Sequence, residues 1–128
     1  MKKYMILTIA SCLLSFSGSA FADILKDLVL EPGFNISIYA DNLDSPRQMA
    51  EGKNGTIFVG ERNGKILALR DLDNNGRVDL KIIVADGLTY STGVSLFNGD
   101  LYFSEISRIW KIENIEDWIA NYSVNSKQ

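Results

Sequence analysis

The residues most suited to chemistry in this sequence form a short acidic run over positions 71–79. It reads Asp-Leu-Asp-Asn-Asn-Gly-Arg-Val-Asp, with oxygen-bearing side chains at its first, third, fifth and ninth positions and glycine at its sixth. Calcium gathers about six to eight oxygen ligands, and glycine permits the sharp turn of such a loop. The spacing therefore predicts a calcium site formed by the side chains of Asp71, Asp73, Asn75 and Asp79 and by the main-chain carbonyl of Arg77.

Two features of the same run favour a simpler interpretation. Position twelve, where an EF-hand loop has a bidentate glutamate, is Ile82, and strands are expected on both sides of the loop. Asp and Asn side chains also accept hydrogen bonds from their own backbone in tight turns. A hairpin closed by such contacts, without an ion, is the alternative.

The composition restricts the other chemistry that is open to the chain. There is no histidine, and therefore neither an imidazole base nor an imidazole metal ligand. The one cysteine, Cys12, lies in a predicted export signal, so thiol catalysis, zinc-thiolate sites and disulfides are not expected in the mature chain. With 13 basic and 16 acidic residues, the chain is not expected to bind nucleic acid either.

The first 22 residues have the pattern of a secretory signal peptide. Two lysines are followed by an apolar core over residues 5–16 and by small residues for cleavage in Ala20-Phe21-Ala22. The core is shorter than the roughly 20 residues of a membrane-spanning helix, and it continues past Cys12, which argues against a lipoprotein. We expect cleavage before Asp23, a periplasmic or secreted product, and no membrane span after cleavage.

The remaining chain reads as short strands separated by turns. Apolar and polar side chains alternate from Phe34 to Tyr39, as in a strand that lies on a core. Four Asn-Gly pairs, which favour tight hairpin turns, recur between the later apolar runs. The sequence therefore predicts an antiparallel meander with a helix near residues 113–121; further strands are expected at residues 56–59, 65–69, 80–85, 94–97, 101–104 and 108–112.

Two segments that lie 44 residues apart resemble one another. Residues 55–61, Gly-Thr-Ile-Phe-Val-Gly-Glu, match residues 99–105, Gly-Asp-Leu-Tyr-Phe-Ser-Glu. A repeat of roughly 40–45 residues containing about four short strands is typical of a β-propeller blade. Apolar residues on both faces of the strand around Phe58 favour blades packed between neighbours. Chance similarity between hairpins is the alternative.

Four motifs follow one another along this part of the chain. Residues 30–40 read Leu-Glu-Pro-Gly-Phe-Asn-Ile-Ser-Ile-Tyr-Ala and residues 45–50 read Ser-Pro-Arg-Gln-Met-Ala; the two others are Gly-Thr-Ile-Phe-Val-Gly at 55–60 and Gly-Asp-Leu-Tyr-Phe-Ser-Glu-Ile-Ser-Arg-Ile at 99–109. Together they resemble the start of the sorbosone dehydrogenase-like sugar dehydrogenases. The resemblance implies an exported quinoprotein on a six-bladed β-propeller, which oxidises a sugar or aldose with pyrroloquinoline quinone and calcium.

The chain is too short for a complete propeller of this kind. The fold class expected is all-β, with antiparallel four-stranded blades truncated to roughly the first two of six, as a partial domain over residues 23–128. Closure needs at least four blades. In the family the catalytic base is a histidine in a later blade, so the resemblance implies no catalytic residue in this chain.

The resemblance also implies where a cofactor would be contacted. In a propeller, the loops that enter the innermost strands converge on one mouth of the central channel, and Arg47 could pair with a quinone carboxylate through two parallel hydrogen bonds. A surface charge paired with an acid such as Asp44 is the alternative for Arg47. The family usually has Pro-Asn-Gly-Val where this chain has Ser-Thr-Gly-Val at 91–94. The candidate contacts are Arg47, Gln48, Ser91 and Thr92.

Two functions therefore stay open. The first is an amino-terminal part of a quinone-dependent sugar dehydrogenase that is inactive alone. The second is an exported, calcium-stabilised interaction module without catalysis. In either case apolar residues on open blade faces, for example Phe58, Tyr102 and Phe103, are expected to favour self-association. Glu61 and Glu105 recur at one blade position and are expected to be architectural.

Overall fold

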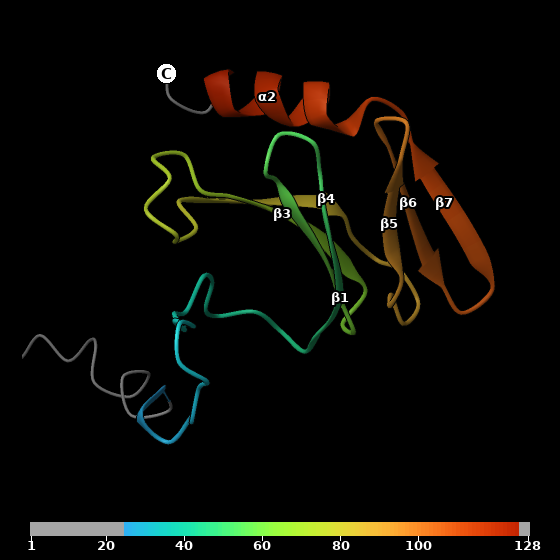
Figure 1. Cartoon of the computed structure of the whole chain (residues 1–128). Helices are drawn as coiled ribbons and strands as arrows, with labels where there is room; N and C mark the ends of the chain where they lie inside the picture. Colours follow the sequence, from blue (N-terminus) through green and yellow to red (C-terminus); the bar gives the residue numbers. More distant parts are fainter. Residues whose placement is uncertain (1–24, 126–128) are drawn as a thin grey trace, which may run out of the picture. The chain divides into compact units, whose positions relative to one another are not determined.

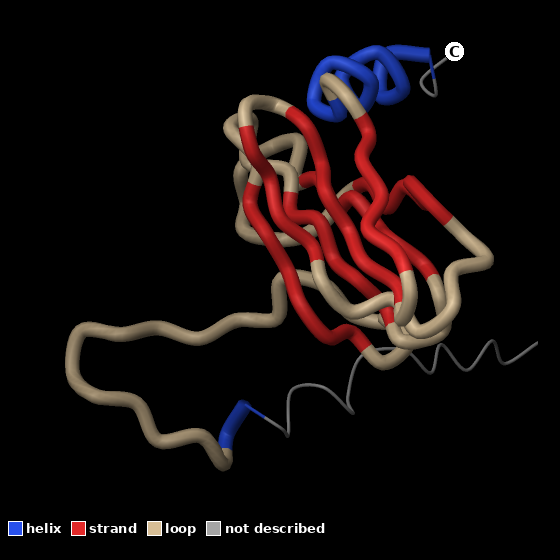
Figure 2. The backbone as a smooth tube through the Cα atoms, turned by 90° about the vertical axis from the view of Figure 1, so that its right-hand side faces the viewer, coloured by secondary structure: helices blue, strands red, loops and turns tan. Residues whose placement is uncertain are grey.

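The computed structural model of the protein describes residues 25–125, and their course is shown in Figures 1 and 2. The chain divides into two units, with the boundary between Ser37 and Ile38. The predicted signal peptide and its cleavage site lie outside the described residues. No helix among the residues described is long and apolar enough to cross a membrane.

The described part of the first unit, residues 25–37, contains no strand. The chain turns at Gly33, which has φ 95°, and the Phe34 N–H donates to the Glu31 carbonyl at 3.2 Å. The strand predicted from Phe34 to Tyr39 is therefore wrong. Its alternating pattern meets no neighbouring strand that would complete a backbone ladder, and the Phe34 side chain is 72% exposed.

Over its described residues, 38–125, the second unit contains seven strands and one helix. All strand pairs are antiparallel and join consecutive strands, which confirms the predicted all-β meander. The first sheet has the order β1-β2-β3-β4 and the second has the order β5-β6-β7. The elements are β1 Pro46–Glu51, β2 Ile57–Glu61, β3 Lys65–Arg70, β4 Leu80–Ala85, β5 Val94–Phe97, β6 Asp100–Glu105, β7 Arg108–Ile112 and α2 Ile115–Asn125.

The two sheets differ in one respect from the predicted pair of four-stranded blades. The second sheet has three strands within the described residues, and neither sheet closes on itself. In the first sheet β3 leads through the acidic loop into β4, whereas β7 leads through a short turn into α2. The third strand of the second sheet is thus followed by a helix, whereas the third strand of the first sheet is followed by a fourth strand.

Apolar side chains pack on both faces of the first sheet, as its sequence predicts. Phe58 on β2 is fully buried against the second sheet and α2, whereas the adjacent Val59 belongs to a separate cluster on the other face. The buried residues of the larger cluster are Phe58, Ile66, Ala68, Ile82, Leu101, Phe103, Ile115 and Ile119. Phe58 and Phe103 are therefore not on open faces, because the two sheets cover each other's apolar residues.

Two glutamates make similar contacts in the two sheets. Glu61, at the end of β2, accepts a hydrogen bond from the Asp44 N–H at 2.7 Å, and Glu105, at the end of β6, accepts one from the Thr89 N–H at 2.8 Å. Backbone bonds repeat beside them, from Arg62 N–H to the Ser45 carbonyl and from Ile106 N–H to the Thr89 carbonyl. Each glutamate therefore fastens the loop that enters its own sheet, which is an architectural role.

The contacts of Glu105 predict how stability depends on pH. The Thr89 N–H, with help from the Trp110 indole and the Arg108 guanidinium, holds the pKa of this carboxyl below its usual value of 4.5. The folded state then binds the proton less tightly than the unfolded chain, so this stabilisation is present above pH 4.5 and is lost as the pH falls through the folded pKa. Urea unfolding between neutral and acidic pH should show a shallower loss for Glu105→Gln than for wild type. Glu31→Gln, an exposed glutamate of the first unit, should retain the wild-type slope.

Candidate functional site

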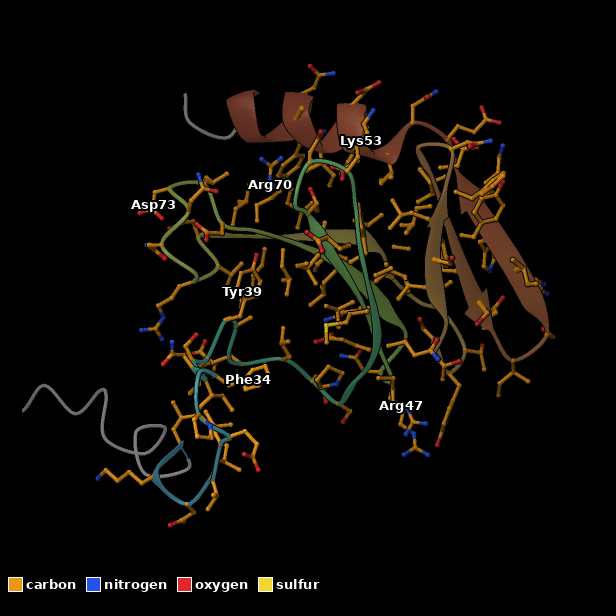
Figure 3. All side chains as sticks on the ribbon, in the orientation of Figure 1. Phe34, Tyr39, Arg47, Lys53, Arg70 and Asp73 are labelled. Atoms are coloured by element: carbon orange, nitrogen blue, oxygen red, sulfur yellow. The ribbon has the colours of Figure 1, made fainter. Side chains whose placement is uncertain are left out.

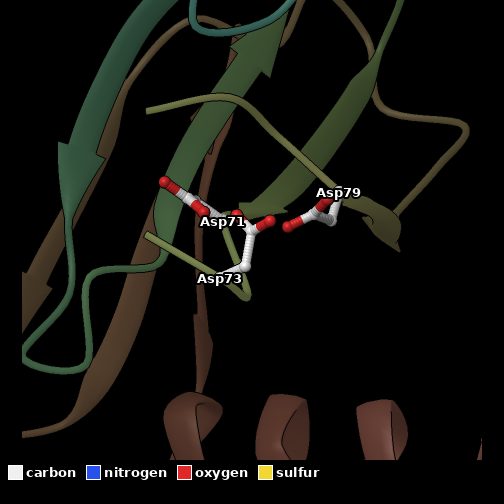
Figure 4. Close-up of side chains that lie close together, drawn as sticks. All are labelled: Asp71, Asp73 and Asp79. Carbon is white, nitrogen blue, oxygen red and sulfur yellow. The ribbon is translucent and has the colours of Figure 1, made fainter. Parts of the chain in front are cut away.

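The acidic loop between β3 and β4 gathers three of the predicted calcium ligands. One carboxylate oxygen from each of Asp71, Asp73 and Asp79 lies within 4.8 Å of the others. Figure 4 shows these side chains grouped at the mouth of the loop. The loop turns sharply at Asn74 and Gly76, which have φ 59° and 82°, so glycine at the sixth position has the role that its spacing predicts.

The same carboxylates also hold the loop's own backbone. The Gly76 N–H donates to Asp71 Oδ2 at 2.8 Å, and the Leu72 N–H donates to Asp79 Oδ2 at 2.7 Å. Partial desolvation raises the pKa of Asp71, but the N–H groups of Gly76, Asn75 and Asn74 outweigh it and hold this pKa below its usual value. The carboxylate is therefore kept ionised to lower pH, as a cation site or an Asx turn requires.

The fourth predicted side-chain ligand, Asn75, is differently placed. The Asn75 side-chain oxygen accepts a hydrogen bond from the Arg77 N–H at 2.9 Å, and its amide nitrogen donates to Asp73 Oδ2 at 2.9 Å. Asn75 is thus directed to its own loop. The loop has both the convergent carboxylates of a cation site and the self-capping contacts of an Asx-rich hairpin.

Tyr39 lies beside the acidic loop in the second unit, and Figure 3 labels it with Asp73. Its carbonyl accepts a hydrogen bond from the Val78 N–H at 2.9 Å, which ties residues 38–40 to the end of the loop. Burial and the negative charge of Asp71 raise the pKa of the Tyr39 phenol. Sequence analysis does not associate Tyr39 with the loop, because 32 positions separate it from Asp71.

The four predicted cofactor contacts fall into different environments. Arg47 lies at the bulge that opens β1 and is exposed, and Figure 3 shows its side chain pointing away from the sheet. Within the described chain Arg47 has no hydrogen-bond or ion-pair partner, and Asp44 instead accepts from Asn63 at 3.0 Å. Ser91 is fully buried and its hydroxyl lacks a partner among the described residues. Thr92 is half-buried.

Gln48 lines a shallow hollow of about 240 Å³ beside β5 and β6. Gly93 allows the chain to approach closely here, since a Cβ at this position would lie 2.7 Å from Ser104 Oγ. No carboxylate or amine lines the hollow among the described residues, so it presents hydroxyl, amide and aromatic groups. Its lining is Gln48, Gly93, Val94, Ser95, Tyr102, Phe103, Ser104 and Ile109.

The structure therefore brings Gln48 together with residues that the sequence does not indicate as cofactor contacts. Ser95 pairs with Tyr102, and Ser104 pairs with Ile109, so all four side chains share one face of the second sheet. The alternation of side chains along β5 to β7 predicts which residues of each strand share a face. Which of these faces lie together in the sheet is known only once the strands are paired.

Comparison with known proteins gives one informative match. An uncharacterized protein of Borreliella burgdorferi is 28% identical over 116 residues, which are 89% of this chain and 28% of that protein. This chain thus matches little more than a quarter of the length of that curated relative. No family model matches the chain, and no solved structure matches it.

Proposed function

We propose that this chain is the amino-terminal part of an exported β-propeller of the sorbosone dehydrogenase-like type, and that it does not oxidise sugars by itself. The observation that supports this best is the recurrence of three consecutive antiparallel strands, in which Glu61 and the glutamate 44 residues later, Glu105, each fasten the loop that enters their sheet. The Borreliella relative has room for further blades, because 116 residues are 28% of its length and it therefore has roughly 400 residues.

The residues of this chain fit part of a quinone site. Pyrroloquinoline quinone, when bound, supplies the electron acceptor for sugar oxidation. Arg47 is exposed, positively charged and free of a partner within the described chain, so its guanidinium can bind a carboxylate of such a ligand. Gln48 offers an amide in the adjacent hollow. Ser91 does not fit as a direct contact, because it is fully buried.

A proton acceptor for the sugar hydroxyl is the part that this chain does not supply. The sequence has no histidine, and the hollow beside Gln48 has no carboxylate among its described lining residues. A general base must lie within hydrogen-bond reach of the proton that it removes. The chain therefore contributes binding groups and architecture to the proposed enzyme, and the base comes from elsewhere in it.

Quinone binding tests this proposal. Titration of the purified chain with pyrroloquinoline quinone, followed by tryptophan fluorescence, should give weak saturable binding that Arg47→Ala weakens about tenfold, the loss of one charge-assisted pair. Arg62→Ala is the matched control, because Arg62 is exposed but donates to the Tyr90 hydroxyl at 2.8 Å. Absence of saturable binding, or an equal loss in both variants, would contradict a quinone contact at Arg47.

We also propose that the acidic loop binds calcium, which supports either form of the function. Three converging carboxylates carry this proposal. Because an ion that binds only the folded state stabilises it, calcium at about 100 times its dissociation constant should add about 2.7 kcal/mol and raise the melting temperature. Asp73→Ala should abolish the rise, whereas Asp86→Ala, outside the loop, should retain it. If calorimetry at millimolar calcium shows no heat of binding, the calcium site is wrong and the loop is a hairpin closed by its own Asp and Asn side chains.

The alternative function is an exported interaction module without catalysis. The observation that favours it is the apolar surface that the second sheet leaves uncovered, where Phe97 is 65% exposed and Ile109 is 78% exposed. A module of this kind would retain calcium binding and lack quinone binding, so the two titrations separate the alternatives.

A further inference from the structure

The second sheet has one covered face and one open face. Strand register places Leu101 and Phe103 toward the first sheet, where both are buried, and turns Tyr102 to the opposite side. Phe97 pairs with Asp100, and Ile109 pairs with Ser104, so both also lie on that opposite side. We call Phe97, Tyr102 and Ile109 the open face.

The repeat indicates what kind of surface covers such a face. Phe58 occupies the position 44 residues before Tyr102, and in the first sheet its side chain is fully buried. The neighbours that bury it include Leu101 and Phe103, which project from the next sheet of the same repeat. The open face of the second sheet thus corresponds to the Phe58 face of the first sheet. In the first sheet, that face is covered by the next sheet of the repeat.

A complementary surface is present at the other side of the first sheet. One row of paired residues crosses this sheet from β1 to β4, and its two central members, Val59 and Leu67, are buried under residues that include Tyr39 and Leu43. The end members stay accessible, with Met49 75% exposed and Ile83 54% exposed. The row is Met49, Val59, Leu67 and Ile83.

Within one chain β1 lies beside β5. Register places Met49 and Phe97 on the faces of their sheets that are turned away from the core shared by the two sheets. If β1 of one copy lay beside β5 of another in the same way, Met49 of the first copy would contact Phe97 of the second. Methionine fills irregular gaps and packs favourably on aromatic rings. Lys111 on the open face is already paired with Asp100 at 3.0 Å and Glu113 at 2.8 Å, so packing on this face does not leave the ammonium group without a partner.

We propose that copies of this chain associate head to tail, with the open face of one copy packed on the Met49 side of the first sheet in the next. The partner is a second copy of the chain. Such a contact is heterologous, because each copy uses two different surfaces, and it extends to rings or open chains of copies. It rests on the repeat architecture, and sedimentation measures it in the absence of quinone. The hollow beside Gln48 shares Tyr102 and Ile109 with the open face, so copies that associate in this way cover the hollow.

Sedimentation velocity of the purified chain tests this over about 1 to 100 µM, the range of weak protein contacts. The weight-average mass should rise with concentration for wild type. Phe97→Glu and Met49→Glu should each be monomeric at the highest concentration, because either change puts a charge into an apolar contact. Ile106→Glu is the matched control: Ile106 is 73% exposed in the β6–β7 turn, outside the open face, and this variant should associate like wild type.

Mixing the two variants distinguishes head-to-tail contact from other modes. Each variant retains one intact surface, so an equimolar mixture should form one-to-one dimers and nothing larger. A mixture that stays monomeric would overturn the proposal, as would a wild-type chain that is monomeric throughout or a control that loses association equally. Thermal unfolding verifies that each variant is folded, and Phe97→Ser with Met49→Ser replaces any glutamate variant that is not.

Discussion

Gly64→Ala is expected to reduce the free energy of unfolding by about 3 kcal/mol. Gly64 has φ 95°, a conformation that disfavours any residue with a Cβ. A Cβ there would also lie 2.1 Å from the Leu88 carbonyl oxygen, and that oxygen belongs to the backbone. The chain must therefore shift where the β2–β3 turn meets the segment that leads into the second sheet.

A matched glycine separates the two causes. Gly55 has φ 74°, and a Cβ there would meet no atom within 4 Å. Gly55→Ala should therefore cost only the conformational part, about 1 kcal/mol. Urea unfolding of both variants gives the comparison. Equal losses would show that the close approach of Gly64 to Leu88 does not matter.

Glu116→Ala is expected to cost about 2 to 4 kcal/mol, because it removes the acceptor for two groups of the β1–β2 turn. Glu116 is 1% exposed, and its Oε2 accepts from the Thr56 hydroxyl at 2.8 Å. Its Oε1 accepts from the Asn54 N–H at 3.2 Å. Thr56 is fully buried, so without the carboxylate its hydroxyl is left without this acceptor.

Asp117→Ala is the control for Glu116→Ala. Asp117 lies in the same first turn of α2 but is exposed, so its loss should cost less than about 1 kcal/mol, the range of helix-dipole effects. A double-mutant cycle with Thr56→Val should give a coupling energy above about 1 kcal/mol. A coupling near zero would show that the Glu116–Thr56 hydrogen bond contributes nothing.

The sequence predicts the strands well where hydrophobic periodicity and Asn-Gly turns agree. Asn98-Gly99 is such a case, since both residues have positive φ, at 51° and 87°, and they join β5 to β6. The predicted helix over 113–121 is confirmed as Ile115–Asn125. The sequence does not predict strand β1, because polar and apolar residues do not alternate over Pro46–Glu51 and the strand is largely exposed at an edge of its sheet.

The candidate site is predictable only where its members are close in sequence. Asp71, Asp73 and Asp79 come together because one loop holds all three. Gln48 and Tyr102 line one hollow although they come from different sheets, and this depends on packing that no local pattern contains. Gly52 is a similar case, since its lack of a side chain makes room for Glu116, 64 positions away.

In the function that we propose, this chain supplies part of a quinone site and no proton acceptor for the sugar. The most direct measurement is the absorbance of pyrroloquinoline quinone bound to the purified chain, with calcium, as an aldose such as glucose is added. The quinone should bind and remain oxidised, because the hollow beside Gln48 has no histidine or carboxylate among its described lining residues to act as the general base. Reduction of the bound quinone by the sugar would contradict the account, since this chain would then contain a complete catalytic site.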